Sequence, residues 1–523
     1  MRWRIHDWCV RLGRVGAALL ATALLLVAAS GDEPVKEGGW LRQKDDKTGV
    51  TIQTMEMTLY PADEPRPALG HQLVPDDFDL IEGNAAIYYL KAMGFLAQDQ
   101  ARSRLGEIHE QAAERARKES KPSSEVPPYL WLAMPPAELP KAELKNYLEL
   151  TSFQPALLQE AARRRQFDLD RNLRGANDPF GYLLPELQAM REIARTQNLR
   201  CKLAIAENRI ADAMAILGQQ YAMVHHIAQD EFLISHLVAI ACAGITWDDA
   251  LYLVQHREAP NLYWAFASLP RPLVDIRRSL AVERQLLYLQ FKALGEVSEA
   301  PRPAGYWQDF LDRLVPQFGS IAGEFGVAPR GDDRQTTRAM LVGFVAAAYP
   351  GAKRYLINDC GLAREQVEAY PTAQVVFLAL VRYYDEARDD CFKWSKLPYW
   401  QADVKTRVLG FEGMLHVKPD RVGWSAMPVQ MLLPAVLTAQ SRAARADQQL
   451  ALVQTVEAIR MHGATHGGRL PASLDELALP APLDPATGKP LDYRLQGDHA
   501  VLSGRETPDI RYQLVLRFAD EAK

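Results

Sequence analysis

The sequence predicts a mainly α-helical protein: an antiparallel, repeat-like array of helical hairpins with a small α+β module at its C-terminus. Two observations lead to this prediction. Apolar residues recur at spacings of three and four through much of residues 79–435, which is the period of a helix buried along one face. Alternating apolar residues, which are typical of strands, occur in residues 48–60 and again in residues 491–518.

The clearest helical pattern covers residues 199–254. Its first apolar stripe is interrupted at Glu207-Asn208-Arg209, and asparagine tolerates the left-handed conformation used at helix ends, so we expect a helix end there. The next helix should run through Ile227, and Asp230 is a suitable N-cap for a third. Small residues on that third helix, including Gly244, predict close packing against neighbouring helices.

Proline-rich joints separate the helical segments and define the domain organisation. Further helices are expected around residues 280–295, 305–325, 335–350, 362–390 and 428–463. The expected domains are a signal peptide or N-terminal anchor (1–30), an extended leader with a short strand (31–78), a helical domain (79–435) and a C-terminal module (436–523).

The first thirty residues have the composition of a secretory signal peptide. Four arginines give a basic start, Val15 to Ala29 is apolar and uncharged, and small residues follow. An apolar run of this length is short for a membrane span, which needs about twenty residues. The order predicts an exported protein, periplasmic or in the cell envelope, with an uncleaved anchor as the alternative.

Charge excludes one class of partner. Removing residues 1–30 takes four basic and one acidic residue from totals of 60 and 65, which leaves a formal charge of −8. Nucleic acid demands clustered Lys and Arg, so no nucleic-acid partner is expected. Membrane contact is expected only through the N-terminal segment, if it is uncleaved.

Four cysteines remain after the signal, and an even number in an oxidising compartment permits two disulfides with three connectivities. Cys360 and Cys391 flank a helical stretch that a disulfide would close. Cys201 and Cys242 lie in apolar helical sequence, where buried free thiols fit equally well. The sequence therefore leaves the pairing open.

Several phrases resemble a large group of exported, uncharacterised proteins common in planctomycete bacteria. They cover most of residues 80–295 and include NAAIYYLKA, YLWLAMPPAELP and APNLYWAFASLPRPLVDIRRSLAVERQLLY. The resemblance implies a helical, exported protein. It supplies no activity and no catalytic residues.

The C-terminal part is similar to the soluble part of type II secretion pseudopilins. A long helix precedes GGRLPASLDEL, LDPATGKPLDYRLQGDHAVLSG and IRYQLVLRF, which predict a turn, a hairpin and a further strand. The chain departs from that family because the hydrophobic N-terminal helix is hundreds of residues away and the prepilin-type processing signal is missing. In some pseudopilins a C-terminal loop binds calcium, and Asp484, Asp492 and Asp498 offer oxygen ligands, although no liganding motif matches.

The candidate metal or acid–base residues of the helical region are His226 and Asp230, which are four apart and share a helix face. His225 points about 100° away, Glu231 follows Asp230, and His236 belongs to the next helix. Neither His-Glu-x-x-His nor paired Glu-x-x-His motifs occur. His226 falls nearly opposite the apolar stripe, so we expect it to be exposed. We expect all five residues to be polar groups on the outside of packed helices rather than a site.

No catalytic signature is present. The sequence lacks a G-x-S-x-G elbow and a G-x-x-x-x-G-K-[ST] phosphate loop, no cofactor is predicted, and Asp248-Asp249 is expected to be a solvated pair. The favoured hypothesis is a non-enzymatic, exported helical scaffold or binding protein with a protein partner in the cell envelope. The alternatives are a hydrolase whose site is assembled from distant residues and an accessory to envelope secretion machinery.

Overall fold

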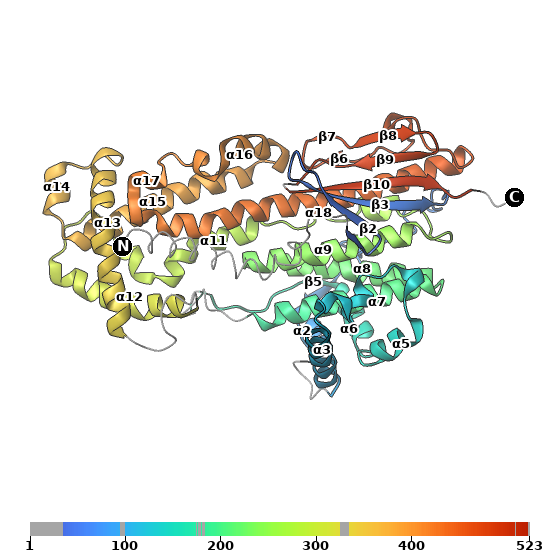
Figure 1. The fold of residues 1–523 in the computed structure, drawn as a ribbon, viewed down its shortest axis with the longest axis horizontal. Coiled ribbons are helices and arrows are strands. Elements are labelled where there is room, and N and C mark those ends of the chain that lie inside the picture. The colour runs from blue at the N-terminus through green and yellow to red at the C-terminus, as the bar shows by residue number, and fades with distance from the viewer. Residues whose placement is uncertain are drawn as a thin grey trace.

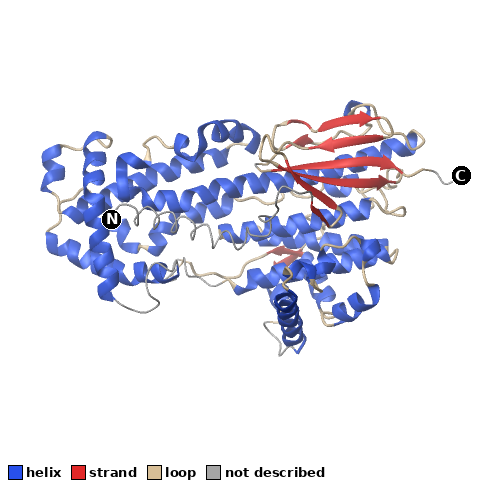
Figure 2. Cartoon of the chain, viewed as in Figure 1, coloured by secondary structure: helices blue, strands red, loops and turns tan. Residues whose placement is uncertain are grey.

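The computed structural model describes residues 35–94, 100–173, 175, 179, 184–324, 334–507 and 509–520. The chain is mainly α, with 60% helix, and the described residues form 17 α-helices and a six-stranded sheet. The molecule is elongated, with the sheet at one end and the helix α18 (Met427–Thr465) running along its length (Figures 1 and 2). The expected signal peptide lies outside the described residues.

The three helices of the clearest sequence pattern form as predicted. They are α7 (Pro185–Ala206), α8 (Ile210–Ile227) and α9 (Leu233–Val254). Asn208 ends α7 with a left-handed φ of 62°, and the Arg209 N–H donates to the Ala204 carbonyl at 2.8 Å. The expected cap of α9 is wrong, because the Asp230 carboxylate accepts no N–H from inside that helix.

The other helices lie on both sides of these three along the chain. In the first half of the chain they are α2 (Ala86–Ala92), α3 (Gln100–Glu119), α4 (Tyr129–Leu132), α5 (Lys141–Glu149), α6 (Gln154–Ala162), α10 (Tyr263–Ala267) and α11 (Arg277–Gln290). In the second half they are α12 (Ala304–Glu324), α13 (Arg334–Asn358), α14 (Arg364–Ala369), α15 (Thr372–Phe392), α16 (Tyr399–Met414) and α17 (Pro419–Val422).

The sheet joins two segments that the sequence assigns to different domains. Its strands are β1 (Val35–Glu37), β2 (Trp40–Lys44), β3 (Thr51–Leu59), β8 (Asp492–Gln496), β9 (His499–Ser503) and β10 (Ile510–Phe518), in the order β1-β2-β3-β10-β9-β8. The expected C-terminal hairpin is β8–β9. The sheet is not purely antiparallel, because β10 pairs in parallel with β3, Leu514 lying opposite Met55. Two small sheets pair β4 (Ile81–Asn84) with β5 (Arg164–Gln166) and β6 (Leu483–Asp484) with β7 (Lys489–Pro490).

One continuous hydrophobic core spans both ends of the chain, from Trp40 in β2 to Leu516 in β10. The leader packs onto the helices rather than extending from them. Gly218 on α8 lies so close to the Leu73 carbonyl that an added Cβ would overlap its oxygen. A glycine is therefore required where the leader crosses α8.

Two helical segments of the described chain are long and apolar enough to cross a membrane by length and composition alone. They are α9 and Pro419–Thr465, which includes α18. The apolar window of α9 is 67% buried inside the protein, where α9 packs against α7, α8 and α18. Burial in a large core accounts for this composition.

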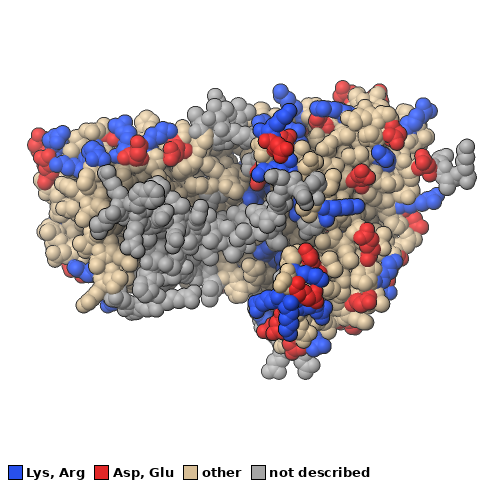
Figure 3. Space-filling view, in the orientation of Figure 1, with Lys and Arg blue, Asp and Glu red and all other residues tan. Residues whose placement is uncertain are grey.

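Charged side chains of both signs are interspersed on the face drawn in Figure 3, including the region around α3. Helix α3 carries neighbouring acidic and basic groups, such as Arg104 with Glu107 at 2.9 Å. Such exposed pairs contribute little to stability.

Candidate functional site

His226 is buried, with 2% of its surface exposed, so the expectation that it faces solvent is wrong. Its Nε2 atom lies 2.8 Å from the Arg164 carbonyl and its Nδ1 atom 2.9 Å from the Tyr89 hydroxyl. A carbonyl only accepts, so Nε2 carries the proton and Nδ1 accepts from Tyr89. Both ring nitrogens are therefore engaged, and burial lowers the pKa of His226 to about 4.

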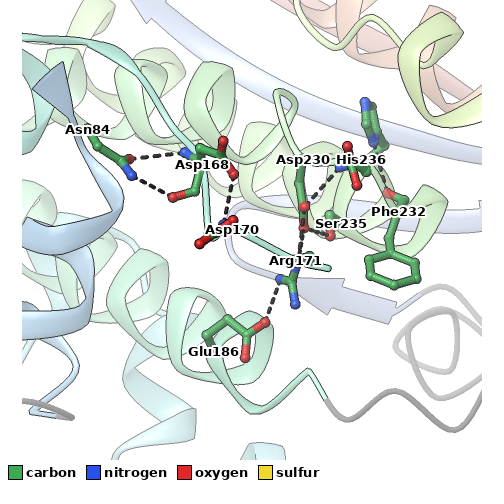
Figure 4. A network of polar contacts seen from close by, with 10 residues as sticks. Asn84, Asp168, Asp170, Arg171, Glu186, Asp230, Phe232, Ser235 and His236 are labelled. Atoms are coloured by element: carbon green, nitrogen blue, oxygen red, sulfur yellow. Dashed lines mark hydrogen bonds and ion pairs between the residues drawn. The ribbon is translucent and has the colours of Figure 1, made fainter. Parts of the chain in front are cut away.

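Asp230 belongs to a different network, drawn in Figure 4. Its carboxylate accepts from the Arg171 Nε atom at 3.0 Å and from the Ser235 hydroxyl, while Arg171 also pairs with Glu186 at 2.5 Å. The Nδ1 atom of His236 donates to the Phe232 carbonyl at 3.0 Å. These contacts fasten the loop that follows β5 to the first turns of α7 and α9.

The C-terminal aspartates do not share a site either. Asp484 is 2% exposed, and its carboxylate accepts from the Gln448 side chain at 2.9 Å and from two backbone N–H groups at 2.8 Å. Asp492 pairs with Arg494 at 2.8 Å on the surface, and Asp498 pairs with His499. Within the described ranges, no three His, Cys, Asp or Glu residues are grouped so as to hold a metal ion.

All four described cysteines are free thiols, so the disulfide that the sequence permits between Cys360 and Cys391 is not formed in the described part of the chain. Cys201, Cys242 and Cys391 are buried.

Asp249 is a second polar group that was expected in solvent and is buried instead. It is fully buried on α9, where Asn198 of α7 and Gln220 of α8 each donate to its carboxylate at 2.7 Å. Burial raises its pKa well above the ordinary value. Lys202, also buried, donates to the Leu132 carbonyl at 2.7 Å. The two bonds to Asp249 join α7, α8 and α9, and the Lys202 bond adds α4.

A cleft of about 310 Å³ lies between the sheet and the helices α7, α9 and α18. We call it the arginine cleft after five of its lining residues: Arg42, Arg191, Arg195, Arg442 and Arg445. Its walls also include Trp40, Gln53, Leu237, Ile240, Ala241, Cys242, Gly244, Ile245, Trp247, Asp248, Gln449, Ile510 and Tyr512. Both ends of the chain therefore build it.

Three aromatic rings pack against one another in the wall of the arginine cleft. The rings of Trp247 and Tyr512 meet edge to face at 4.7 Å, and Trp40 lies 5.2 Å from Trp247. The Trp40 indole N–H donates to Asp248 at 2.9 Å. Asp248 is the only carboxylate among the described lining residues, and this bond holds it against the wall.

Gly244 faces the arginine cleft. The small residues of α9 predict close helix packing, yet an added Cβ at Gly244 would meet no atom within 4 Å. Glycine inside a helix costs up to about 1 kcal/mol relative to alanine, and here no neighbouring backbone requires it. The glycine instead leaves room in the cleft.

The sequence contains the arginines but no local signal of the cleft, because its residues come from six elements that meet only in the folded chain. No protein family model, curated protein or solved structure matches this chain.

Proposed function

We propose that this chain is an exported helical binding protein that holds a ligand in the arginine cleft without transforming it. The observation that carries the proposal is the cleft itself, a space of about 310 Å³ to which β2, β3, α7, α9, α18 and β10 all contribute. This volume lies at the lower end of the range for small-molecule sites.

The lining residues support binding rather than catalysis. Histidine, serine, lysine and glutamate do not occur among its described members. Burial raises the pKa of the Cys242 thiol to about 12, and a thiol that stays protonated is a poor nucleophile. Asp248 already accepts the Trp40 N–H. A general base and a nucleophile in reach of one another are therefore missing from this set.

The rest of the fold acts as a scaffold in this proposal. Helices α7, α8 and α9 are consecutive, joined by short connections and packed against one another, which supports an antiparallel hairpin arrangement at the centre of the array. Extended helical layers leave faces for other molecules, and a protein partner in the cell envelope stays a prediction.

Native mass spectrometry of the protein purified from its own cell envelope tests the proposal. We expect a bound small molecule that is lost from the variant Arg442→Gln and retained by Arg494→Gln, which changes an exposed arginine on β8. The released molecule should be unchanged after prolonged incubation with fresh protein. Conversion into a product would favour the hydrolase, and retention by Arg442→Gln would overturn the proposed site.

Export has a separate test. The basic and apolar composition of residues 1–30 supports a signal peptide. Mass analysis of the mature protein should place its first residue near Gly31 in a fractionated envelope sample. Recovery of an intact chain from the cytoplasm would contradict export.

A further inference from the structure

We infer that the ligand of the arginine cleft is a small organic anion, in which a phosphate, sulfonate or carboxylate group is carried on a compact apolar body. The inference rests on the proposed function and names its ligand class. The inference follows from the charge of the cleft, from two arginines that have no hydrogen bond or ion pair within the described chain, and from the open space at Gly244.

The charge of the cleft is strongly unbalanced. Five guanidinium groups line it against one described carboxylate, Asp248. Two of the arginines have acidic partners outside the lining. Arg195 pairs with Glu192 at 2.5 Å, and Arg445 pairs with Asp509 at 2.7 Å and donates to the Thr507 carbonyl at 2.8 Å. Their positions are therefore fixed by the protein.

Arg191 and Arg442 are in a different state. Within the part of the chain that the structure describes, neither has a hydrogen bond or an ion pair, although both are half-buried. The Nε atom of Arg442 is buried and has no hydrogen-bond partner, whereas its two terminal nitrogens are not fully buried. Two guanidinium groups of the lining are thus available to a ligand, one on α7 and one on α18.

Electrostatics disfavours this arrangement in the absence of a ligand. Burial and then the neighbouring Arg195 lower the pKa of Arg191, and burial and then Arg445 lower the pKa of Arg442. Each charged form is destabilised by lost hydration and by a like charge. An oxyanion between the two side chains would reverse both effects through charge-assisted hydrogen bonds.

The shape of the cleft indicates that the anion has an apolar part. Helix α9 lines the cleft with Ile240, Ile245 and Trp247, which lie on either side of the open space at Gly244. A bare inorganic ion would leave this strip in water. A neutral molecule would leave the arginines unpaired, and a cation would be repelled by them.

Calorimetry on the full chain tests the inference with four probes: phenyl phosphate, benzoate, inorganic phosphate and benzyl alcohol. We expect the two aromatic anions to bind at least about tenfold more tightly than inorganic phosphate, and benzyl alcohol not to bind. Affinity should fall as salt rises. Comparison of phenyl phosphate with benzoate tells which oxyanion the guanidinium pair prefers. Equal binding of benzyl alcohol and phenyl phosphate would overturn the inference.

Variants locate the site. Arg191→Gln and Arg442→Gln should each weaken binding of the preferred anion about tenfold or more, because each removes a charged donor. Gly244→Leu should abolish binding by filling the cleft while the melting temperature is kept, since a Cβ there meets no neighbour. Arg494→Gln is the matched control and should bind normally. Unchanged affinity in Gly244→Leu would overturn the site even if an arginine variant failed to fold.

The two proposals fail differently. A neutral molecule that copurifies with the protein and is lost from Gly244→Leu, together with no binding of any anion, would reject the anionic ligand and retain the binding function. Anion binding accompanied by chemical turnover would reject the non-catalytic function and retain the ligand class.

Discussion

The guanidinium group of Arg460 lies 2.9 Å from the carboxylate of Glu457, one turn earlier on α18, and neither side chain is accessible to solvent. The same guanidinium donates to the carbonyls of Tyr60 at 3.0 Å and Ala259 at 2.8 Å. The pair therefore ties α18 to the segment after β3 and to the loop after α9. The two opposite charges compensate each other, and the guanidinium group supplies hydrogen bonds to backbone carbonyls from distant parts of the chain.

Arg460→Leu should lower the free energy of unfolding by about 3–5 kcal/mol, because it leaves the Glu457 carboxylate buried without its cation. Urea unfolding measures the loss. Arg494→Leu, which breaks an exposed pair with Asp492, should cost less than about 1 kcal/mol. Adding Glu457→Met to Arg460→Leu should restore part of the stability. Equal costs for the two arginine variants would contradict this role.

His226 should make stability depend on pH in a defined window. Its folded-state pKa, about 4, lies below the ordinary 6.5, so its contribution to stability is complete above about pH 6.5 and is lost as the pH falls toward 4. The stability gap between the wild type and His226→Gln should therefore shrink by up to about 3 kcal/mol across this window. Denaturant titrations at a series of pH values measure it. His256→Gln, in the turn after α9 where the histidine is only partly buried, is the control, and a gap that is constant with pH would refute the prediction.

The thiols should differ in reactivity toward iodoacetamide under native conditions. Burial raises the pKa of Cys242 and of Cys391 to about 12, and it raises that of Cys201 well above the ordinary value. Cys360 is only partly buried. Peptide mapping should find Cys360 labelled first and the other three labelled only after denaturation. A disulfide-linked peptide that joins Cys360 to Cys391 would contradict the free-thiol state.

Replacing Gly218 or Gly244 with alanine should change the free energy of unfolding in opposite directions. Gly218→Ala places a methyl group against the Leu73 carbonyl and should cost about 1–3 kcal/mol, with faster proteolysis of residues 61–80. Gly244→Ala meets no atom and should stabilise α9 by about 0.5–1 kcal/mol. Thermal unfolding measures both stability changes, and limited chymotrypsin digestion, which can cleave after the exposed Leu69 and Phe78, measures the proteolysis. The same sign for both variants would contradict the packing described for α8 and α9.

Local periodicity was sufficient for much of the fold. It predicted α7, α8 and α9, with the break at Asn208, and it predicted the strand Ile510–Phe518. These features depend on neighbouring residues along the chain. The parallel pairing of β10 with β3 has no such local signal, because it joins segments at opposite ends of the sequence.

The polar residues were harder to place for a related reason. His226 is opposite the apolar stripe of α8, but Tyr89 and the backbone of Arg164 cover that second face. Asp249 lies on a helix that is buried on most sides, so its surroundings leave no contrast between an apolar and a polar face. Periodicity reveals one contact surface per helix, and it fails where a second layer is added.

Strand β3 is complete at Leu59, yet the strand that covers its inner edge begins only at Ile510. About 450 residues separate them. At a ribosomal rate of roughly 5–20 residues per second, that edge waits roughly 20–90 s for its partner. The nascent polypeptide therefore cannot complete this sheet until β10 has been synthesised, because β10 is the strand that joins β3 to β9.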